Sequence, residues 1–293
     1  MPDSMSIIIP SLNEGDNLER TVRNMIVTIG LEDYEIIVVN EGGTETSSIR
    51  NLPKISIYET GRQGSAQARN FGAAVSNKNV LLFADAHIEF KRGWGKRLLR
   101  LLELDKNCII APCITRLGDE ESRGCGYRWA DPTMEIDWLP DSGQAVHEVP
   151  FAIAACLAIE KRMFQEIGRF DSGIRFYGEE DTELCLRAWL LGYRVLCDPA
   201  IRVGHLFRDA FPYEIHYSNQ LYNQIRLAFS HFGAQRLTSY LRTLYDIEEF
   251  DTAFELAMRS DVLPRRVELF KKRVHSDNWF FKKFPMPGWT SIN

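Results

Sequence analysis

The chain has 293 residues and a mass of 33.7 kDa, with 45% hydrophobic and 26% charged residues, which is an ordinary globular composition. These values exclude fibrous, disordered and disulfide-stapled mini-protein classes, and the length is sufficient to bury a core of one or two domains. The net charge of −5 is unevenly distributed, because residues 259–293 carry +5 and residues 1–258 carry −10. We therefore expect the basic C-terminal segment either to bind an anionic partner or to fold back on the acidic body.

Membrane and secretion signals are absent from the sequence pattern. The longest apolar runs, 79–84 and 151–159, are far shorter than the roughly 20 residues of a membrane span, and no basic-then-apolar signal pattern opens the chain. The six cysteines form no C-x-x-C pair, which argues against a zinc site or a disulfide framework. These features together predict a cytoplasmic protein.

The first third of the chain alternates short β-branched runs with segments of helical periodicity. We expect strands at 6–9, 34–39, 55–58 and 79–84, and helices at 16–29 and 64–75. This alternation predicts an α/β fold with a mostly parallel sheet. Polar segments follow three of these strands, at 10–14, 40–44 and 85–87. Because open α/β sheets bind ligands beyond the carboxyl ends of their strands, we expect these segments to meet at one functional edge.

The rest of the chain is less regular. Residues 118–149 are rich in Gly, Pro, Asp and Trp and lack a clear period, so we predict an irregular insertion that forms a wall or lid over the functional edge. Strands are expected at 151–160 and 193–197, a helix at 179–191, and a largely helical region from 213. The predicted organisation is an α/β domain at 1–212 with a helical, basic extension at 213–293 packed on it.

A metal site is suggested by the tripeptide at 85–87. Asp85 and His87 stand two positions apart at a strand end, so both side chains can point the same way. A carboxylate with an imidazole suits a borderline-hard divalent ion such as Mn²⁺. His205 follows another predicted strand and is the candidate third ligand. The alternative is a simple strand-end turn with a solvated Asp85.

Five segments follow one another in the order of a known set of signatures. They read SIIIPSLNE (6–14), EIIVVNEGGT (35–44), ARNFGA (68–73), LLFADAH (81–87) and GEEDTELCLR (178–187). This series resembles the signature segments of family 2 nucleotide-sugar glycosyltransferases with the GT-A fold. The Asp-x-His form, with VGHLFR and NQIRLA further along, is most similar to the catalytic domain of polypeptide N-acetylgalactosaminyltransferases. The resemblance implies a GT-A catalytic domain followed by the helical extension.

The resemblance also implies a donor site. Asp85, His87 and His205 would hold Mn²⁺, with Mg²⁺ as the alternative, against the diphosphate of a UDP-sugar. Arg69 would face the nucleotide or its phosphates, and a surface salt bridge is its alternative role. The residues expected to border the nucleotide-sugar are Pro10, Ser11, Asn13, Glu14, Asn40, Glu41, Arg69 and Asp85. The family usually has Asp-Asp at positions 40 and 41, so this chain has either a changed base preference or a weakened donor site.

The implied acceptor side centres on Glu180 and Asp181. The family places a Glu-Asp pair here, and in inverting members the Asp is the general base, which makes Asp181 the candidate base. The alternative is that these acidic residues only favour a helix amino terminus. Polypeptide transferases carry Glu-Asn and retain configuration, so the stereochemistry stays open, with inversion favoured. Trp129 and Trp138 are candidate acceptor-side residues, with core packing as the alternative.

The sequence thus predicts a metal-dependent glycosyltransferase that moves a sugar from a UDP-sugar to a hydroxyl-bearing glycan, peptide or small molecule. The alternatives are a transferase that modifies hydroxylated bases in nucleic acid, and a catalytically weak nucleotide-sugar-binding protein. Residues 265–289 interleave cations with aromatic residues. That pattern suits a nucleic acid, a membrane surface or the protein's own acidic body, and the last is the favoured interpretation.

Overall fold

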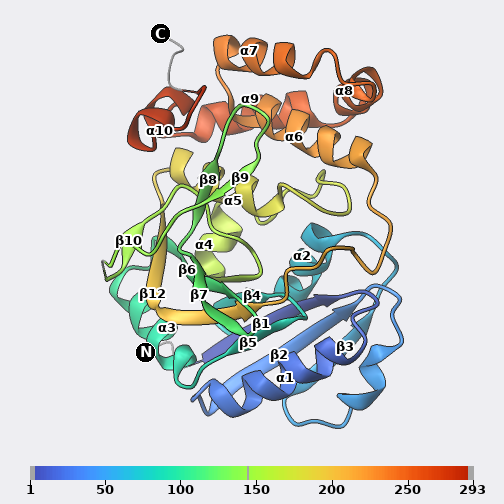
Figure 1. The fold of residues 1–293 in the computed structure, drawn as a ribbon, viewed down its shortest axis with the longest axis vertical. Helices are drawn as coiled ribbons and strands as arrows, with labels where there is room; N and C mark the ends of the chain where they lie inside the picture. The colour runs from blue at the N-terminus through green and yellow to red at the C-terminus, as the bar shows by residue number, and fades with distance from the viewer. Residues whose placement is uncertain (1–3, 144, 290–293) are drawn as a thin grey trace.

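The computed structural model describes residues 4–143 and 145–289, which form a mixed sheet with helices on both faces (Figure 1). The sheet has ten strands with the main order β10-β12-β6-β11-β4-β1-β2-β3, while β5 pairs with β12 and β7 pairs with β6. Its strands are β1 (Ser4–Ser11), β2 (Asp33–Asn40), β3 (Ile55–Glu59), β4 (Val80–Ala84), β5 (Ile88–Phe90), β6 (Cys108–Arg116), β7 (Asp119–Gly124), β10 (His147–Glu148), β11 (Cys156–Glu160) and β12 (Arg194–His205).

Parallel pairing dominates the half of the sheet that the N-terminal residues form. Strands β3, β2, β1 and β4 are parallel neighbours, β11 lies antiparallel to β4 and β6, and β12 runs parallel to β6. This arrangement confirms the predicted α/β class with a mostly parallel mixed sheet. The strand expected at 193–197 continues to His205, and the one expected at 151–160 begins only at Cys156.

Alternate side chains of the strands pack into two separate hydrophobic cores, one on each face of the sheet. Ile7 and Ile9 of β1 pack on the face covered by α1 (Asp16–Thr28) and α3 (Trp94–Leu104). Ile8, between them, packs on the face covered by α2 (Ser65–Val75), α4 (Lys161–Glu166) and α5 (Glu180–Leu190). A strand presents successive side chains to opposite faces, so a run of buried residues on both faces produces the continuous apolar pattern seen in the sequence.

The insertion at 118–149 is more ordered than its lack of period predicted. It contains β7, the end strand β10, and a two-stranded hairpin of β8 (Tyr127–Trp129) and β9 (Ile136–Trp138). Gly124 permits this folding, because a Cβ there would lie 2.2 Å from a ring carbon of Trp138. Strands of two to six residues are too short for a hydrophobic period to reveal, which explains the wrong expectation.

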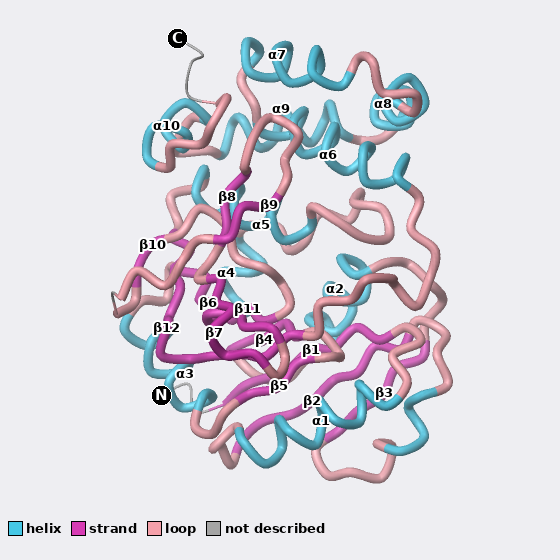
Figure 2. Tube along the Cα trace, in the orientation of Figure 1, coloured by secondary structure: helices cyan, strands magenta, loops and turns pink. Residues whose placement is uncertain are grey.

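Five helices follow the α/β part of the chain. They are α6 (Tyr217–His231), α7 (Ala234–Leu244), α8 (Phe250–Arg259), α9 (Val262–Lys272) and α10 (Asp277–Lys283). Figure 2 shows them gathered at one end of the molecule, with α1 and the first strands at the other end. No helix within residues 4–143 and 145–289 is long and apolar enough to cross a bilayer.

The aromatic residues of the segment 265–289 lie mostly inside the protein. Phe280, Phe281 and Trp289 are buried, and Trp289 lies 5.2 Å from Trp129 between ring centroids. Arg265 of the same segment forms ion pairs with buried carboxylates of the body. The segment therefore folds back on the acidic body, and these three rings are not available for stacking on a base or inserting into a membrane surface.

Candidate functional site

A cavity of about 540 Å³ opens at the carboxyl ends of the parallel strands. Its walls come from the turns after β1, β2 and β4, from the hairpin strand β9, from the start of α5 and from the segment after β12. Cavities of this size suit an organic ligand of several hundred daltons. The structure therefore joins at one edge the three polar turns that the sequence predicted to meet.

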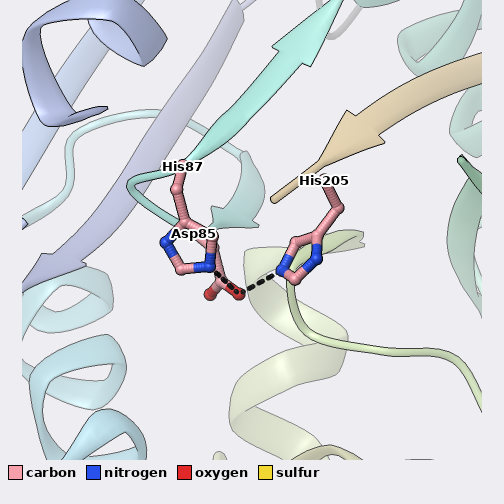
Figure 3. Close-up of side chains that lie close together, drawn as sticks. All are labelled: Asp85, His87 and His205. Atoms are coloured by element: carbon pink, nitrogen blue, oxygen red, sulfur yellow. Dashed lines mark ion pairs between the residues drawn. The ribbon is translucent and has the colours of Figure 1, made fainter. Parts of the chain in front are cut away.

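Asp85, His87 and His205 converge at the floor of this cavity (Figure 3). One ligand atom from each lies within 4.8 Å of the others. Both imidazoles turn Nε2 toward Oδ2 of Asp85, at 3.9 Å from His87 and 3.4 Å from His205. His205 arrives there because β12 pairs antiparallel with β5, which places His205 opposite Ile88.

The surroundings of Asp85 keep its carboxylate charged and oriented. Oδ1 accepts a hydrogen bond from Nη2 of Arg69 at 2.8 Å, which leaves Oδ2 to the two histidines. Burial acts to raise the pKa of Asp85, but the hydrogen bond with His205 and the charge of Arg69 outweigh it and hold that pKa well below its usual range. Asp85 is therefore an anion, as a metal ligand must be.

The two histidines differ in how their second ring nitrogen is held. Nδ1 of His87 lies 3.2 Å from Oε2 of Glu14, a carboxylate that fixes the imidazole and leaves Nε2 to face Asp85. Nδ1 of His205 is buried and has no hydrogen-bond partner. One carboxylate oxygen and two imidazole nitrogens fit a divalent ion such as Mn²⁺.

Arg69 lines the cavity, as expected of a residue near the nucleotide-sugar, and it is also held by two ion pairs. Its guanidinium is buried and bridges two carboxylates, Asp85 on one side and Glu180 on the other, at 2.8 and 2.9 Å. The two ion pairs use Nη1 and Nη2, and Nε has no hydrogen-bond partner. The small residues around Arg69 in the sequence reflect close packing of α2 against the sheet, where a Cβ on Gly72 would meet Ile8 at 2.4 Å.

Glu180 and Asp181 open helix α5 at the wall of the cavity. Glu180 is held by Arg69 and by a 2.6 Å hydrogen bond from Ser65 Oγ. Asp181 lines the cavity and accepts backbone N–H bonds from Ala154 at 3.0 Å and from Thr182 at 2.8 Å. Burial and the nearby charge of Glu180 raise the pKa of Asp181 to about 6. A carboxylate with that pKa is ionised at neutral pH and can accept a proton.

Most of the residues expected near a nucleotide line the cavity, and two do not. Those that line it are Pro10, Ser11, Glu14, Glu41, Arg69 and Asp85. Asn40 is buried at the end of β2, where its amide donates to Gly43 O and Glu59 Oε2 at 2.7 Å each. Asn13 donates to Pro212 O instead. The side chain of Asn40 therefore supports the turn after β2 and does not face the ligand space.

The two tryptophans separate in the same way. Trp138 lines the cavity from β9, whereas Trp129 is fully buried among Phe151, Phe281 and Trp289. Trp129 is thus a core residue, and its expected place on the acceptor side is wrong. The sequence around Trp129 could not distinguish a core tryptophan from one that contacts a ligand, because strand β8 has only three residues.

The sequence reasoning missed several residues of the cavity wall. They are Arg62, Phe176, Tyr177, Phe207, Arg208, Phe211, Tyr213 and Gln220. Most lie in segments without regular structure, for which hydrophobic periodicity carries no information. Arg208 belongs to the VGHLFR segment, and it pairs with Glu14, the carboxylate that holds His87.

Comparison with known proteins gives one family match. Residues 6–168 match the model of "Glycosyl transferase family 2". Polypeptide N-acetylgalactosaminyltransferase 8 of Drosophila melanogaster is 29% identical over 238 residues, which cover 74% of this chain and 40% of that protein. Polypeptide N-acetylgalactosaminyltransferase 10 of Homo sapiens is 28% identical over 235 residues, covering 72% of this chain and 39% of that protein. The chain thus spans about two fifths of the length of these relatives.

A solved structure agrees with the fold. GalNAc-T7, whose crystal structure contains UDP, GalNAc and Mn²⁺, superposes with a TM-score of 0.74 at 22% identity. The superposition covers 96% of this chain and 56% of that chain. The likeness confirms the predicted GT-A fold.

Proposed function

Because this chain belongs to glycosyl transferase family 2, we propose that it is a metal-dependent enzyme that moves a sugar from a UDP-sugar to a hydroxyl-bearing acceptor. The observation that carries the proposal is the Asp85, His87 and His205 cluster at the floor of the cavity. The UDP and Mn²⁺ in the GalNAc-T7 structure support this choice of donor and ion.

Each residue at the floor has a defined part in donor binding. Asp85, His87 and His205 would hold the ion through one carboxylate oxygen and two ring nitrogens. A divalent ion bound there supplies positive charge that stabilises a departing diphosphate. Glu14 orients His87, and Arg69 keeps Asp85 ionised and turned toward the histidines. The donor site therefore depends on two supporting ion pairs as well as on three ligands.

On the other wall, Asp181 is the proposed general base. It would take the proton from the acceptor hydroxyl, and its pKa of about 6 leaves it ionised at neutral pH. We propose inversion of configuration, because Asp181 is a carboxylate where the polypeptide transferases have an asparagine. Trp138 and Ile136 of β9 line the same cavity and would contact the acceptor.

The acceptor itself stays a broad class in this proposal: a glycan, a peptide or a small molecule with a hydroxyl group. We do not extend it to nucleic acid, because three rings of the segment 265–289 are buried in the core. A cytoplasmic location remains a prediction of the sequence.

The test is a thermal-shift panel of UDP, GDP, UDP-GalNAc and UDP-GlcNAc, with Mn²⁺ or with EDTA, because a ligand that binds the native state raises the melting temperature. The variant His205→Ala is measured beside His216→Ala, a matched control at an exposed histidine outside the cavity. We expect a Mn²⁺-dependent shift with one UDP-sugar that His205→Ala loses and His216→Ala keeps. No shift with any nucleotide would contradict the proposal and favour a protein that has kept the fold for another ligand.

A further inference from the structure

The loop at 171–179, which leads into α5, has a backbone that requires outside support. Phe176 and Glu179 have positive φ angles of 49° and 69°, a region that residues other than glycine rarely adopt. Phe176, Tyr177, Gly178 and Glu179 all line the cavity. Strained backbone of this kind persists only where neighbouring groups hold it, so the contacts of this loop identify what fixes the cavity wall.

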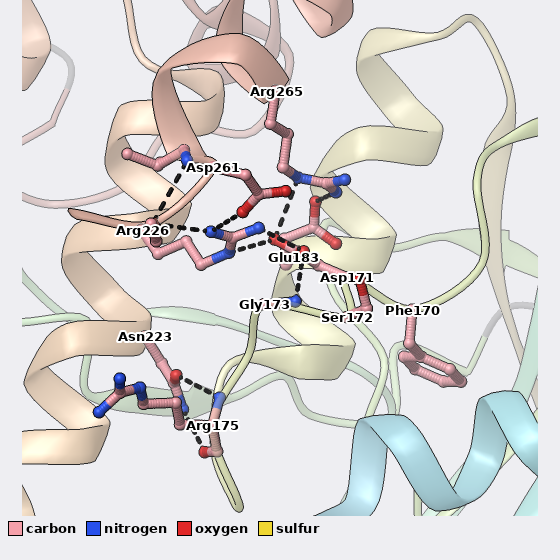
Figure 4. Close-up of polar contacts among 12 residues, drawn as sticks. Phe170, Asp171, Ser172, Gly173, Arg175, Glu183, Asn223, Arg226, Asp261 and Arg265 are labelled. Atoms are coloured by element: carbon pink, nitrogen blue, oxygen red, sulfur yellow. Dashed lines mark hydrogen bonds and ion pairs between the residues drawn. The ribbon is translucent and has the colours of Figure 1, made fainter. Parts of the chain in front are cut away.

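Asn223, on α6, makes four hydrogen bonds to the backbone of this loop. Its Oδ1 accepts the N–H of Arg175 at 2.8 Å, and its Nδ2 donates to the carbonyls of Arg175, Tyr177 and Gly178 at 2.9, 3.1 and 3.0 Å. The side chain is fully buried, and Figure 4 shows it facing Arg175. All its hydrogen-bond partners belong to the loop, so the side chain of Asn223 fixes the conformation of that backbone.

One turn further along α6, Arg226 holds the start of the same loop. Its Nε and Nη2 donate to the two carboxylate oxygens of Asp171 at 2.8 Å each, and both side chains are buried (Figure 4). Gly173 lies directly against this guanidinium, because a Cβ there would be 2.0 Å from Arg226 Cζ. Helix α6 therefore contacts both the beginning and the end of the loop, and it packs closely against Gly173.

The far side of the loop reaches the catalytic wall. The carbonyl of Phe176 accepts the N–H of Ser65 at 2.9 Å, and Gly178 donates its N–H to Glu180 Oε2 at 2.9 Å. Glu180 is in turn bonded to Arg69 and directly precedes Asp181. A shift of the backbone at 175–178 would therefore move the start of α5 relative to the metal cluster.

We infer that Asn223 is a positioning residue: its amide fixes the backbone at 175–178 and thereby sets the place of Asp181 against the donor. The inference rests on the proposed function, because Asp181 matters only if an acceptor is deprotonated there. A displacement of about 1 Å of a reacting group can lower a rate roughly 10²-fold. We therefore expect removal of the Asn223 amide to lower kcat.

The experiment compares Asn223→Ala with Asp277→Asn, a control at a buried carboxylate that pairs with Arg236 and joins α7 to α10. Mn²⁺-dependent hydrolysis of UDP-GalNAc and UDP-GlcNAc to UDP and free sugar, with water as the acceptor that Asp181 would deprotonate, gives kcat and KM. Hydrogen exchange follows the peptide that contains 175–181. For Asn223→Ala we expect kcat to fall roughly 10²-fold, with KM for the sugar nucleotide within about threefold of wild type and faster exchange at 175–181. Asp277→Asn should keep the wild-type kcat even if it lowers the melting temperature as much as Asn223→Ala does.

Each other outcome is decisive. Wild-type kcat in Asn223→Ala, or unchanged exchange at 175–181, overturns the inference. The milder Asn223→Ser replaces Asn223→Ala if the latter does not fold, and failure of both to fold, while Asp277→Asn folds, assigns Asn223 to the fold alone and also overturns it. If wild type neither binds UDP nor releases it from the sugar nucleotides, the proposed function fails, and the exchange data still show separately whether Asn223 orders the loop.

Discussion

Two clusters of charged side chains lie near helix α5, and they differ in whether they border the cavity. The floor cluster consists of Asp85, His87 and His205, and it borders the cavity. The helix cluster consists of Asp171, Glu183, Arg226 and Arg265, together with His231, and it joins α5 to α6 and α9. Both contain buried ionisable groups, but of these two clusters the floor cluster is the one that lines the 540 Å³ cavity.

Their hydrogen bonds differ as well. Every carboxylate oxygen of Asp171 and Glu183 has an arginine or histidine partner, so these charges neutralise one another within the protein. In the floor cluster, Oδ2 of Asp85 faces two ring nitrogens at 3.4 and 3.9 Å, Nδ1 of His205 has no hydrogen-bond partner, and all three side chains line the cavity. Burial of charge alone therefore does not identify a site, whereas metal-ligating atoms that converge beside a cavity do.

The largest expected effect comes from the floor cluster. Asp85→Asn removes the anionic ligand, and the loss of charge stabilisation worth several kcal/mol corresponds to a rate decrease of about 10³-fold. The measurement is Mn²⁺-dependent UDP release from UDP-GalNAc and UDP-GlcNAc. A variant that keeps more than a tenth of the wild-type rate would show that the ion binds elsewhere or that none is needed.

Asp181→Asn should have the next largest effect, a decrease in kcat of about 10²-fold, which is typical for the loss of a general base. Binding of UDP should be unchanged, because Asp181 lies on the proposed acceptor wall and is not one of the proposed metal ligands. In wild type, kcat should fall tenfold per pH unit below a pKa of about 6, since protonation of Asp181 removes the base. A pH-independent rate between 5 and 7 would contradict this role.

An Asp-to-Asn change in the helix cluster should lower stability and leave UDP binding unchanged. Asp171→Asn leaves Arg226 and Arg265 without one of their buried carboxylates, so we expect a loss of about 3 kcal/mol in the free energy of unfolding. Urea unfolding measures this loss, and the affinity for UDP with Mn²⁺ should remain that of wild type. Weaker UDP binding with unchanged stability would contradict the claim that the helix cluster stabilises the fold and does not bind the ligand.

The smallest effect concerns His231, which bonds to Glu183 at 2.9 Å and also faces the charges of Arg187 and Arg265. Burial lowers the pKa of His231, with the two arginines adding to the decrease. The unfolded chain therefore binds a proton that the folded chain resists, and stability falls as the pH drops below about 6.5. The variant His231→Gln should show a flatter decline of melting temperature between pH 7 and 5. An equal slope in the two proteins would exclude His231 as a cause.

The sequence contained enough information for the floor of the cavity but not for its far wall. A continuous apolar run that stops at Asp85 predicts a strand end, and two-residue spacing puts His87 beside it. The return of His205 to the same point depends on the pairing of β5 with β12, and β5 has only three residues. The predicted strand before His205 made it the candidate third ligand, and the family motifs supported that choice, but hydrophobic periodicity could not predict the strand pairing that brings it to the floor.

Asn223 illustrates the limit more sharply. Asn223 opens the NQIRLA segment, so the family resemblance marked the residue but not its role, because its four bonds reach a loop 45 to 48 positions earlier in the chain. Trp129 and Trp138 show the same limit, because two aromatic residues of one hairpin divide between core and cavity. Contacts between distant segments decide such roles, and local sequence does not record them.

The most direct test of the central claim, that the floor cluster holds a divalent ion for a UDP-sugar, is an isothermal titration of UDP into the wild-type protein with Mn²⁺ and after treatment with EDTA. The account predicts that removing the ion weakens UDP binding by at least about tenfold and that restoring Mn²⁺ recovers it. UDP affinity that is the same with and without the ion would contradict it.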